Sequence, residues 1–345
     1  MHPLELQTLN IIHRDSLIPA GGKIVVGVSG GADSVGLLVV LSNLSEILNI
    51  SLIAVYVDHG LRPDETEKER SYIDSLTAVL QVQFEGMKVN ADEHAHAMKL
   101  SLEHAARDLR YQALRKVAGD YDASVITTAH TADDQAEEVI IRLLRGSGRK
   151  GISGMRTKYS DIARPFLETE KQDIIAYLGE KGIRFLEDSS NADLRFLRNR
   201  VRHELIPFLE QRFDTGIKQA LRKTAESLAE DEKLLEELTE RACEKIFITA
   251  GPDDEPPCRK LFIKRQEFVQ QPEALQRRII EKLLWQIGSR AHYTHIMQII
   301  AAAKNGRTGS EIHLTKGLRV GVQREHLEFV YPEGRQAWRG RLYRE

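Results

Sequence analysis

The stretch from Ser29 to Ser34 reads SGGADS, with two adjacent glycines between hydroxyl side chains and an acid. It follows the β-branched run KIVVGV and precedes a leucine-rich stretch with helical spacing. Consecutive backbone amides in a glycine-rich turn form a concave anion site, and the following helix adds its dipole. Gly30 and Gly31 let a phosphate approach the backbone closely, and both tolerate positive φ. Ser29 and Ser34 can donate hydroxyl hydrogen bonds, so we expect this loop to bind phosphate.

Asp33 does not suit a simple phosphate site, because its carboxylate repels the anion unless a cation lies between them. A metal-bound nucleotide meets that condition, with Asp33 reaching Mg²⁺. The loop fits neither the Walker A pattern GxxxxGK[ST] nor the dinucleotide fingerprint GxGxxG. The spacing therefore predicts a nucleotide loop of another kind.

The elements around this loop alternate between strand and helix patterns. Strands are expected at residues 23–29, 51–59, 82–89 and 123–130, and helices at 3–14, 35–48, 65–80, 101–118 and 133–146. Such alternation predicts an α/β fold with a parallel sheet covered by helices on both faces. Ligands of these sheets bind at the carboxyl ends of the strands. Asp58, His59 and His130 fall at such ends, as does the Ser29–Ser34 loop.

The pattern changes after about residue 210. Residues 215–247 have helical spacing, and the segment AGPDDEPP reads as a Pro-rich acidic linker. A short strand at 260–268, two helices through about Asn305 and a β-hairpin or meander at 311–331 complete the chain. We therefore expect a catalytic α/β domain at residues 1–210, followed by a smaller, mainly helical domain at 211–345 with a short β appendage.

Composition excludes several classes of protein. The 345 residues are 41% hydrophobic and 29% charged, which indicates a globular chain. No apolar stretch approaches the roughly 20 residues of a membrane span, and the opening residues lack the pattern of a secretion signal. The two cysteines, Cys243 and Cys258, are too few for a disulfide framework. We expect a cytoplasmic protein without a membrane partner.

The net charge of −2 hides two basic stretches. Residues 142–158 carry six basic side chains and no acid, and residues 195–203 carry four arginines and a histidine. A solvated surface is the ordinary explanation of one charge run. Two such runs in a nearly neutral chain indicate an anionic partner larger than a nucleotide.

The loop SGGADS resembles the SGGxDS signature of the PP-loop, or N-type ATP pyrophosphatase, family. Three further segments are similar to one branch, the tRNA(Ile)-lysidine synthetases. They are EHAARDLRY at 103–111, TAHTADDQAEEVIIRLLRGSG at 128–148 and EDSSNADLRFLRNRVRHELIP at 187–207. With YVDHGLR at 56–62, the resemblance covers most of residues 23–210.

The resemblance implies a reaction in two steps on the wobble cytidine of tRNA(Ile) with a CAU anticodon. ATP first adenylates the cytosine C2 oxygen and releases pyrophosphate. The ε-amine of L-lysine then attacks C2 and expels AMP, which leaves lysidine and changes the codon read from AUG to AUA. It also implies that ATP is held by Ser29, Gly30, Gly31, Ala32, Asp33, Ser34, Asp58 and His59, and Mg²⁺ by Asp33 and Asp134.

The residue types suit this chemistry. Negative charge grows at the α-phosphorus, so a cation should stabilise the transition state; Arg110 is the first choice and Arg107 the second. His130 can donate to a phosphate oxygen or move a proton. Asp134 is expected on Mg²⁺ or on the lysine ammonium group, with Glu137 beside it on the lysine. Asp133 is expected to cap the helix that starts there.

We expect the two basic stretches to contact the tRNA. Arginines bind phosphates, and the glycines between them let the RNA backbone approach the chain closely. A wobble base must be splayed out to be read and modified. Surface arginines held in salt bridges remain the alternative for each residue. The expected set is Arg142, Arg145, Arg149, Arg195, Arg198, Arg200 and Arg202. The tail GRQAWRGRLYRE has no assigned role, and the sequence leaves open whether the chain forms a homodimer.

Three other functions compete with this one. A tRNA thiolase needs a sulfur carrier or an iron–sulfur cluster, but both cysteines lie outside the expected α/β domain. An amide-forming synthetase acting on a small molecule would not need two basic stretches. A non-catalytic RNA-binding module would not need a metal-binding carboxylate.

Overall fold

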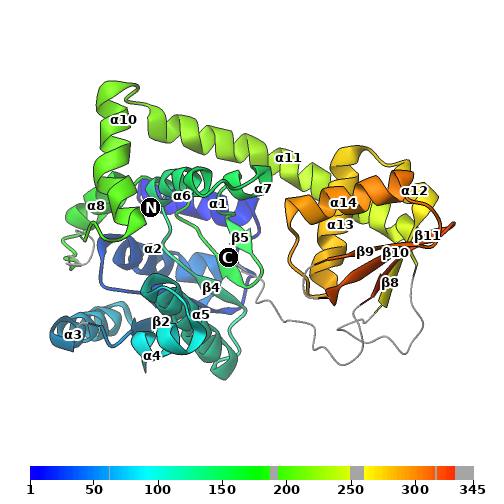
Figure 1. Cartoon of the computed structure of the whole chain (residues 1–345). Coiled ribbons are helices and arrows are strands. Elements are labelled where there is room, and N and C mark those ends of the chain that lie inside the picture. Colours follow the sequence, from blue (N-terminus) through cyan, green and yellow to red (C-terminus); the bar gives the residue numbers. More distant parts are fainter. Residues whose placement is uncertain (62, 187–192, 249–259, 315–316, 331–345) are drawn as a thin grey trace. The chain divides into compact units, whose positions relative to one another are not determined.

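The computed structural model describes residues 1–61, 63–186, 193–248, 260–314 and 317–330 (Figure 1). The chain divides into two compact units, Met1–Ala229 and Glu230–Glu345. The division falls inside one long helix, α11 (Ile217–Ile246). The boundary expected at residue 210 lies before the start of that helix.

A six-stranded sheet, in the order β3-β2-β1-β4-β6-β5, forms the centre of the N-terminal unit. Its strands are β1 (Lys23–Val28), β2 (Ser51–Asp58), β3 (Gln83–Lys88), β4 (Val125–Thr127), β5 (Lys158–Tyr159) and β6 (Ile162–Ala163). Val25 of β1 pairs with Ile53 on one side and Ile126 on the other, both in parallel register. The predicted parallel sheet is therefore confirmed. The two-residue strands β5 and β6, which pair in antiparallel fashion, were not expected.

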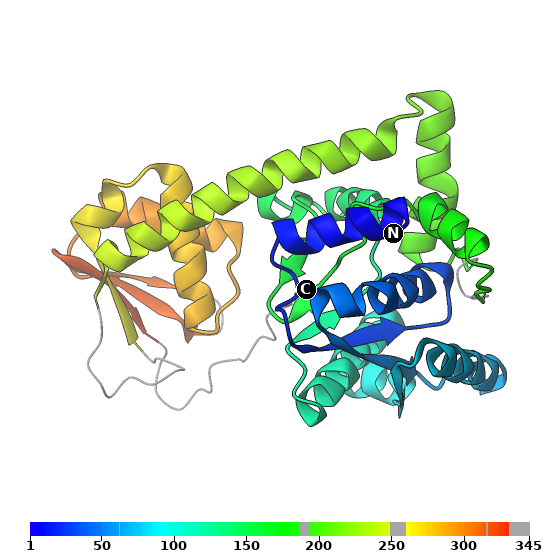
Figure 2. The ribbon, with the colours of Figure 1, turned by 180° about the vertical axis from the view of Figure 1, so that it is seen from behind.

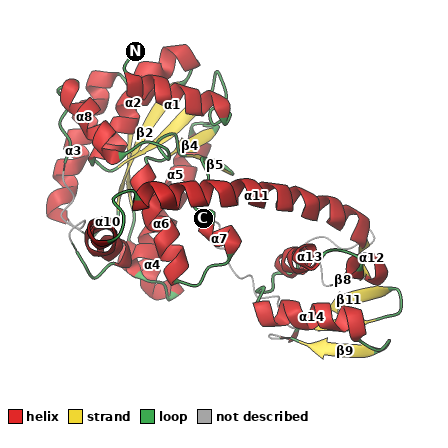
Figure 3. Cartoon of the chain, turned by 90° about the horizontal axis from the view of Figure 1, so that it is seen from above, coloured by secondary structure: helices red, strands yellow, loops and turns green. Residues whose placement is uncertain are grey.

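Helices cover both faces of this sheet, as Figures 2 and 3 show. Those in this unit are α1 (Pro3–Arg14), α2 (Ala32–Leu48), α3 (Pro63–Leu80), α4 (Ala91–Met98), α5 (Leu102–Asp120), α6 (Ala132–Leu144), α7 (Arg149–Ile152), α8 (Lys171–Glu180), α9 (Leu197–Arg200) and α10 (Ile206–Arg212). Side chains of a strand alternate between faces. Ile24 and Val26 thus join the core formed by α1, α2 and α8, whereas Val25 joins the core formed by α5. The β-branched run of β1 is buried from both sides.

A glycine in α2 brings α8 unusually close. A Cβ atom built on Gly36 would lie 2.4 Å from Cγ2 of Ile174 and 3.6 Å from the ring of Phe166. Ile174 is fully buried, so it has no free space into which to retreat. Gly36 therefore sets the distance between the two helices.

A buried carboxylate links α1, α2 and α8. Glu5 accepts hydrogen bonds from the Tyr177 hydroxyl at 2.7 Å, the Asn43 amide at 2.9 Å and the backbone N–H of His2 at 2.8 Å. Lys181 lies 3.5 Å away. Burial alone would raise the pKa of Glu5, but the hydrogen bonds outweigh it and lower this pKa to about 2.

The C-terminal unit contains more β structure than the sequence indicated. Its antiparallel sheet has five strands in the order β7-β8-β11-β10-β9, and α12 to α14 pack with it around one apolar core. The elements are β7 (Phe247–Ile248), β8 (Lys260–Lys264), α12 (Arg265–Val269), α13 (Glu273–Gln286), α14 (Tyr293–Asn305), β9 (Ser310–His313), β10 (Arg319–Val322) and β11 (His326–Val330). The acidic linker and the C-terminal tail lie outside the described residues. No helix in the described part of the chain is long and apolar enough to span a membrane.

We predict that Gly36→Ala destabilises the protein by about 1–3 kcal/mol, because the added methyl group overpacks the α2–α8 contact. Gly119→Ala in α5 is the matched control, since nothing lies within 4 Å of its Cβ position. The free energies of unfolding in urea check this. Equal effects of the two substitutions would contradict the role of Gly36.

We predict that Glu5→Gln destabilises the protein by about 3 kcal/mol at pH 7. A carboxyl whose pKa is lowered from 4.5 to about 2 stabilises the fold fully above pH 4.5, and this contribution is lost as pH falls toward 2. Wild type and variant should therefore converge in unfolding experiments at low pH. Glu180→Gln, at an exposed carboxylate that pairs with His2, should have little effect at either pH.

Candidate active site

The loop after β1 has the geometry of an anion site. Gly30 adopts a φ of +87°, which only glycine enters easily. The Ser34 hydroxyl donates to the carbonyl of Gly31 at 3.0 Å and accepts from the backbone N–H of Ser29 at 3.1 Å. Helix α2 begins at Ala32, and its N-cap, Gly31, provides no side-chain cap. The first amides of α2 and its positive dipole end are therefore available to a ligand.

Asp33 lies in the first turn of α2 and is only partly satisfied. Its Oδ1 is buried without a hydrogen-bond partner among the described residues. Its Oδ2 lies 3.5 Å from Nζ of Lys171, the first residue of α8. Burial raises the pKa of Asp33, and the charge of Lys171 opposes this shift. Such an unsatisfied carboxylate oxygen is suited to binding a cation.

The other residues expected at strand ends also lie where the sheet topology predicts. Asp58 ends β2, and its Oδ1 accepts from the backbone N–H of Gly60 at 2.8 Å. His59 follows it and is half-buried. His130 follows β4, and its Nδ1 lies 2.9 Å from the Thr128 hydroxyl.

His130 is held in its neutral form. Burial is the main cause of its lowered pKa; the Asp134 carboxylate opposes the shift, and the charges of Arg164, Arg107 and Arg198 add to it. The lowered pKa makes this imidazole a weak base, so at neutral pH it acts as a hydrogen-bonding group.

Helix α5 carries both candidate arginines for the α-phosphate. Arg110, the first choice, is exposed, and Arg107, one turn earlier, is half-buried. The positive charge of Arg107 contributes to the lowered pKa of His130. Arg164, which follows β6, is almost completely buried near the same histidine.

The cap of α6 differs from the expected one. The Thr131 hydroxyl bonds to the N–H of Asp134, and the Asp134 carboxylate bonds back to Thr131, which forms a capping box. Asp133 instead accepts from the backbone N–H of Lys171 at 3.0 Å and from the ammonium of Lys218 at 3.0 Å. The prediction that Asp133 caps the helix was wrong, because Asp134 stands at the position that reaches back to the N-cap.

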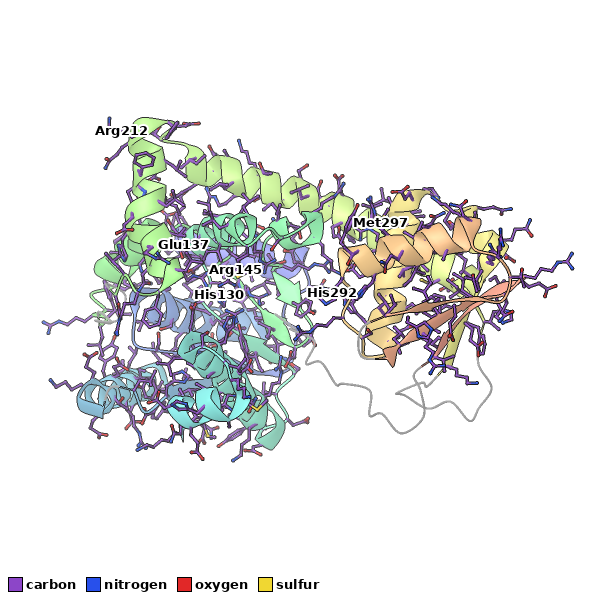
Figure 4. The ribbon with its side chains drawn as sticks, in the orientation of Figure 1. His130, Glu137, Arg145, Arg212, His292 and Met297 are labelled. Atoms are coloured by element: carbon purple, nitrogen blue, oxygen red, sulfur yellow. The ribbon has the colours of Figure 1, made fainter. Side chains whose placement is uncertain are left out.

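Glu137 is not on a solvated helix face, since its side chain is only 2% exposed. Its Oε1 accepts from Nε of Arg202 at 2.6 Å, and its Oε2 accepts from Nε of Arg198 at 3.1 Å. Arg202 also donates to Oδ1 of Asp134 at 3.0 Å. Figure 4 labels His130 and Glu137, which lie just before and within α6. A buried charge of this kind requires a close counter-ion.

The basic residues expected to contact tRNA therefore separate into two groups. Arg142, Arg198 and Arg202 are largely buried and paired with acids of α6. Arg145 (Figure 4), Arg149, Arg195 and Arg200 are exposed. The alternative of salt-bridged arginines applies to the first group and also to Arg195, which lies 2.7 Å from Asp193. The segment with Asp188, Ser190 and Asn191 lies outside the described residues.

A pocket joins Asp33 to the acids of α6. Its lining is Asp33, Thr131, Asp133, Glu137, Lys171, Arg202, Ile206 and Lys218. The sequence interpretation missed Lys171 and Lys218, because neither belongs to a motif that it used. Lys171 could have been found by its position, since it opens the helix that follows the last strand of the sheet.

Comparisons with known proteins agree with this geometry. Residues 4–209, more than half of the chain, match the PP-loop domain family. The tRNA(Ile)-lysidine synthase of Clostridium perfringens (strain 13 / Type A) is 32% identical over 319 residues, which cover 91% of this chain and 66% of that protein. That of Symbiobacterium thermophilum is 33% identical over 336 residues, or 95% and 69% of the two proteins. That of Geobacillus kaustophilus is 32% identical over 317 residues, or 90% and 67%.

Among solved structures, the U34-tRNA thiolase NcsA from Methanococcus maripaludis with its [4Fe-4S] cluster is similar at a TM-score of 0.56 and 17% identity. The match covers 66% of this chain and 78% of that chain, and it shows a shared fold. Fold and site thus define a protein of the PP-loop class. Within that class, the chain belongs to the tRNA(Ile)-lysidine synthase family, and it spans 66% of the length of the clostridial relative.

We predict that Arg202→Ala destabilises the protein by about 3 kcal/mol, because it removes one of the two counter-ions of the buried Glu137 carboxylate and leaves its Oε1 unpaired. The matched control is Arg195→Ala. The Arg195 side chain is 88% exposed, so its loss should change the free energy of unfolding by less than about 0.5 kcal/mol. Thermal and urea unfolding measure both. If Arg202→Ala left stability unchanged but weakened tRNA binding, Arg202 would instead be a residue that contacts the tRNA.

Proposed function

We propose that the protein ligates L-lysine to C2 of the wobble cytidine of tRNA(Ile) with a CAU anticodon, using ATP. The single observation that carries the proposal is Asp33, whose Oδ1 is buried without a partner among the described residues, at the uncapped N-terminus of α2. This arrangement suits a metal-bound phosphate. The names of the relatives supply the substrate class.

In the first step, the cytosine C2 oxygen attacks the α-phosphorus of ATP, and the bond to the bridging oxygen breaks. Pyrophosphate leaves with the electron pair. The residues from Ser29 to Ser34 hold the phosphates, with Asp58 and His59 at the neighbouring strand end. Arg110, or Arg107 one turn earlier, supplies the positive charge at the α-phosphate.

Mg²⁺ fits this site through Asp33, whose Oδ1 lacks a partner among the described residues. Asp134 fits less well, because Thr131 and Arg202 already occupy its two oxygens. The described residues also contain no group of three or more His, Cys, Asp and Glu side chains that could hold a metal alone. When bound, the ion would neutralise phosphate charge and take its other ligands from the nucleotide and water.

In the second step, the lysine ε-amine attacks C2 and AMP leaves, which forms lysidine. The attacking amine loses its proton to water. His130 is too weak a base for this step, because burial lowers its pKa to about 3, and its neutral imidazole instead donates a hydrogen bond to a phosphate oxygen. Asp134 and Glu137 attract the ammonium group of lysine, in competition with Arg198 and Arg202. The exposed arginines Arg145, Arg149, Arg195 and Arg200 bind the tRNA phosphates.

The test is release of AMP and pyrophosphate from ATP with an isoleucine CAU-anticodon transcript, with and without lysine. We expect lysine-dependent AMP release on this tRNA and none on the initiator methionine tRNA. Turnover that depends on a sulfur donor or on ammonia would instead indicate one of the rival PP-loop reactions.

We predict that Asp33→Asn lowers pyrophosphate release by at least about 10²-fold, because it removes the charge that holds the cation at the phosphates. Affinity for the tRNA should stay within a few-fold of wild type, measured by filter binding. Near-normal turnover in the variant would remove Asp33 from the metal site.

A further inference from the structure

We propose that Lys171 is a further phosphate-binding residue, which contacts the pyrophosphate group of ATP and stabilises it as it leaves. The inference rests on the proposed function and extends it to a residue outside the sequence motifs. It follows from where α8 is held, from what surrounds the ammonium group and from the pocket that it lines.

The close packing of α2 and α8 fixes the position of Lys171. Gly36 and Ile174 form the tight contact between these helices. Asp33 and Lys171 each lie three residues earlier, which is nearly one helical turn, and their charged groups are 3.5 Å apart. The first turns of α2 and α8 therefore lie side by side. The contact between Gly36 and Ile174, one turn later, holds Lys171 beside the phosphate loop.

The backbone of Lys171 is anchored as well. Its N–H donates to Oδ2 of Asp133 at 3.0 Å, so the first turn of α8 is tied to the first turn of α6. The side chain, in contrast, is 42% exposed. A fixed backbone with an accessible side chain is the arrangement expected of a residue that meets a ligand.

The ammonium group of Lys171 has binding capacity to spare. An ammonium has three donors, and the contact with Asp33, at 3.5 Å, is at the limit of a hydrogen bond. Lys218, which lines the same pocket, differs, because it lies 3.0 Å from Asp133 and 3.7 Å from Glu210. Lys171 is thus the pocket lysine better able to take a new anionic partner.

The surroundings favour a phosphate at this point. The uncapped start of α2 is next to Lys171, and its amides and dipole attract an anion. Asp33 is the opposing charge, and Mg²⁺ bound to the nucleotide would satisfy it. Lys171 could then move from Asp33 to a phosphate oxygen and donate hydrogen bonds to the departing pyrophosphate. No proton needs to be transferred.

The test compares Lys171→Ala with Lys171→Arg and with Lys181→Ala. Lys181 is a matched control, since it lies at the other end of α8, is 41% exposed and also lies 3.5 Å from a carboxylate. Binding of Mg²⁺-pyrophosphate and Mg²⁺-ATP is measured by isothermal titration calorimetry. Pyrophosphate release is measured with saturating tRNA, and thermal unfolding shows that each variant is folded.

We expect Lys171→Ala to weaken the binding of added pyrophosphate about 10-fold, as for loss of one charged donor. The rate at which pyrophosphate is formed from ATP should fall about 10²-fold. Lys171→Arg should keep most of both, and Lys181→Ala should resemble wild type. Unchanged binding and release in Lys171→Ala, beside a wild type that binds both ligands, would overturn this inference alone. A wild type that binds neither ligand would overturn the proposed function as well.

Discussion

The carboxylate of Glu137 is the constraint on which the arrangement of the site depends. A charge that is 2% exposed cannot persist without partners, and the partners here come from a segment about sixty residues later. Arg198 and Arg202 reach Glu137 because α9 and the turn Val201–Leu205 pack against α6. The apolar contacts of Ile140 and Ile141 with Val201 and Ile206 support that packing. Electrostatics and apolar packing thus hold this segment against α6.

Much of the fold could be predicted from local patterns. The run KIVVGV predicts a buried strand because its β-branched side chains suit burial on both faces, and the structure confirms it. The alternation of strands and helices also located the edge where Ser29, Asp58 and His130 lie. The strands β5 and β6 have two residues each, which is too short for any periodicity to show. The five-stranded sheet was underestimated because its strands are also short.

What the sequence did not show at the site has a common physical cause. Helical spacing shows that Arg198 and Arg202 share a face, but it does not show what that face meets. Their acidic partners are distant in sequence, and the tertiary fold alone brings them together. The same limit applies to the cap of α6, where two adjacent acids have equal propensity and the geometry of the first turn selects Asp134.

The transition between α9 and α10 has a consequence for how this segment tolerates change in length. Val201–Leu205 forms a π-helical turn, and Pro207, which cannot donate a backbone hydrogen bond, follows two residues later. The five residues of this turn advance about as far around the axis as four residues of an α-helix, because a π-helix turns less per residue. Deleting one residue between Arg202 and Ile206 would therefore restore an ordinary α-helix and leave Ile206 facing Ile140 and Ile141. A deletion outside this turn would instead rotate the later side chains by about 100°.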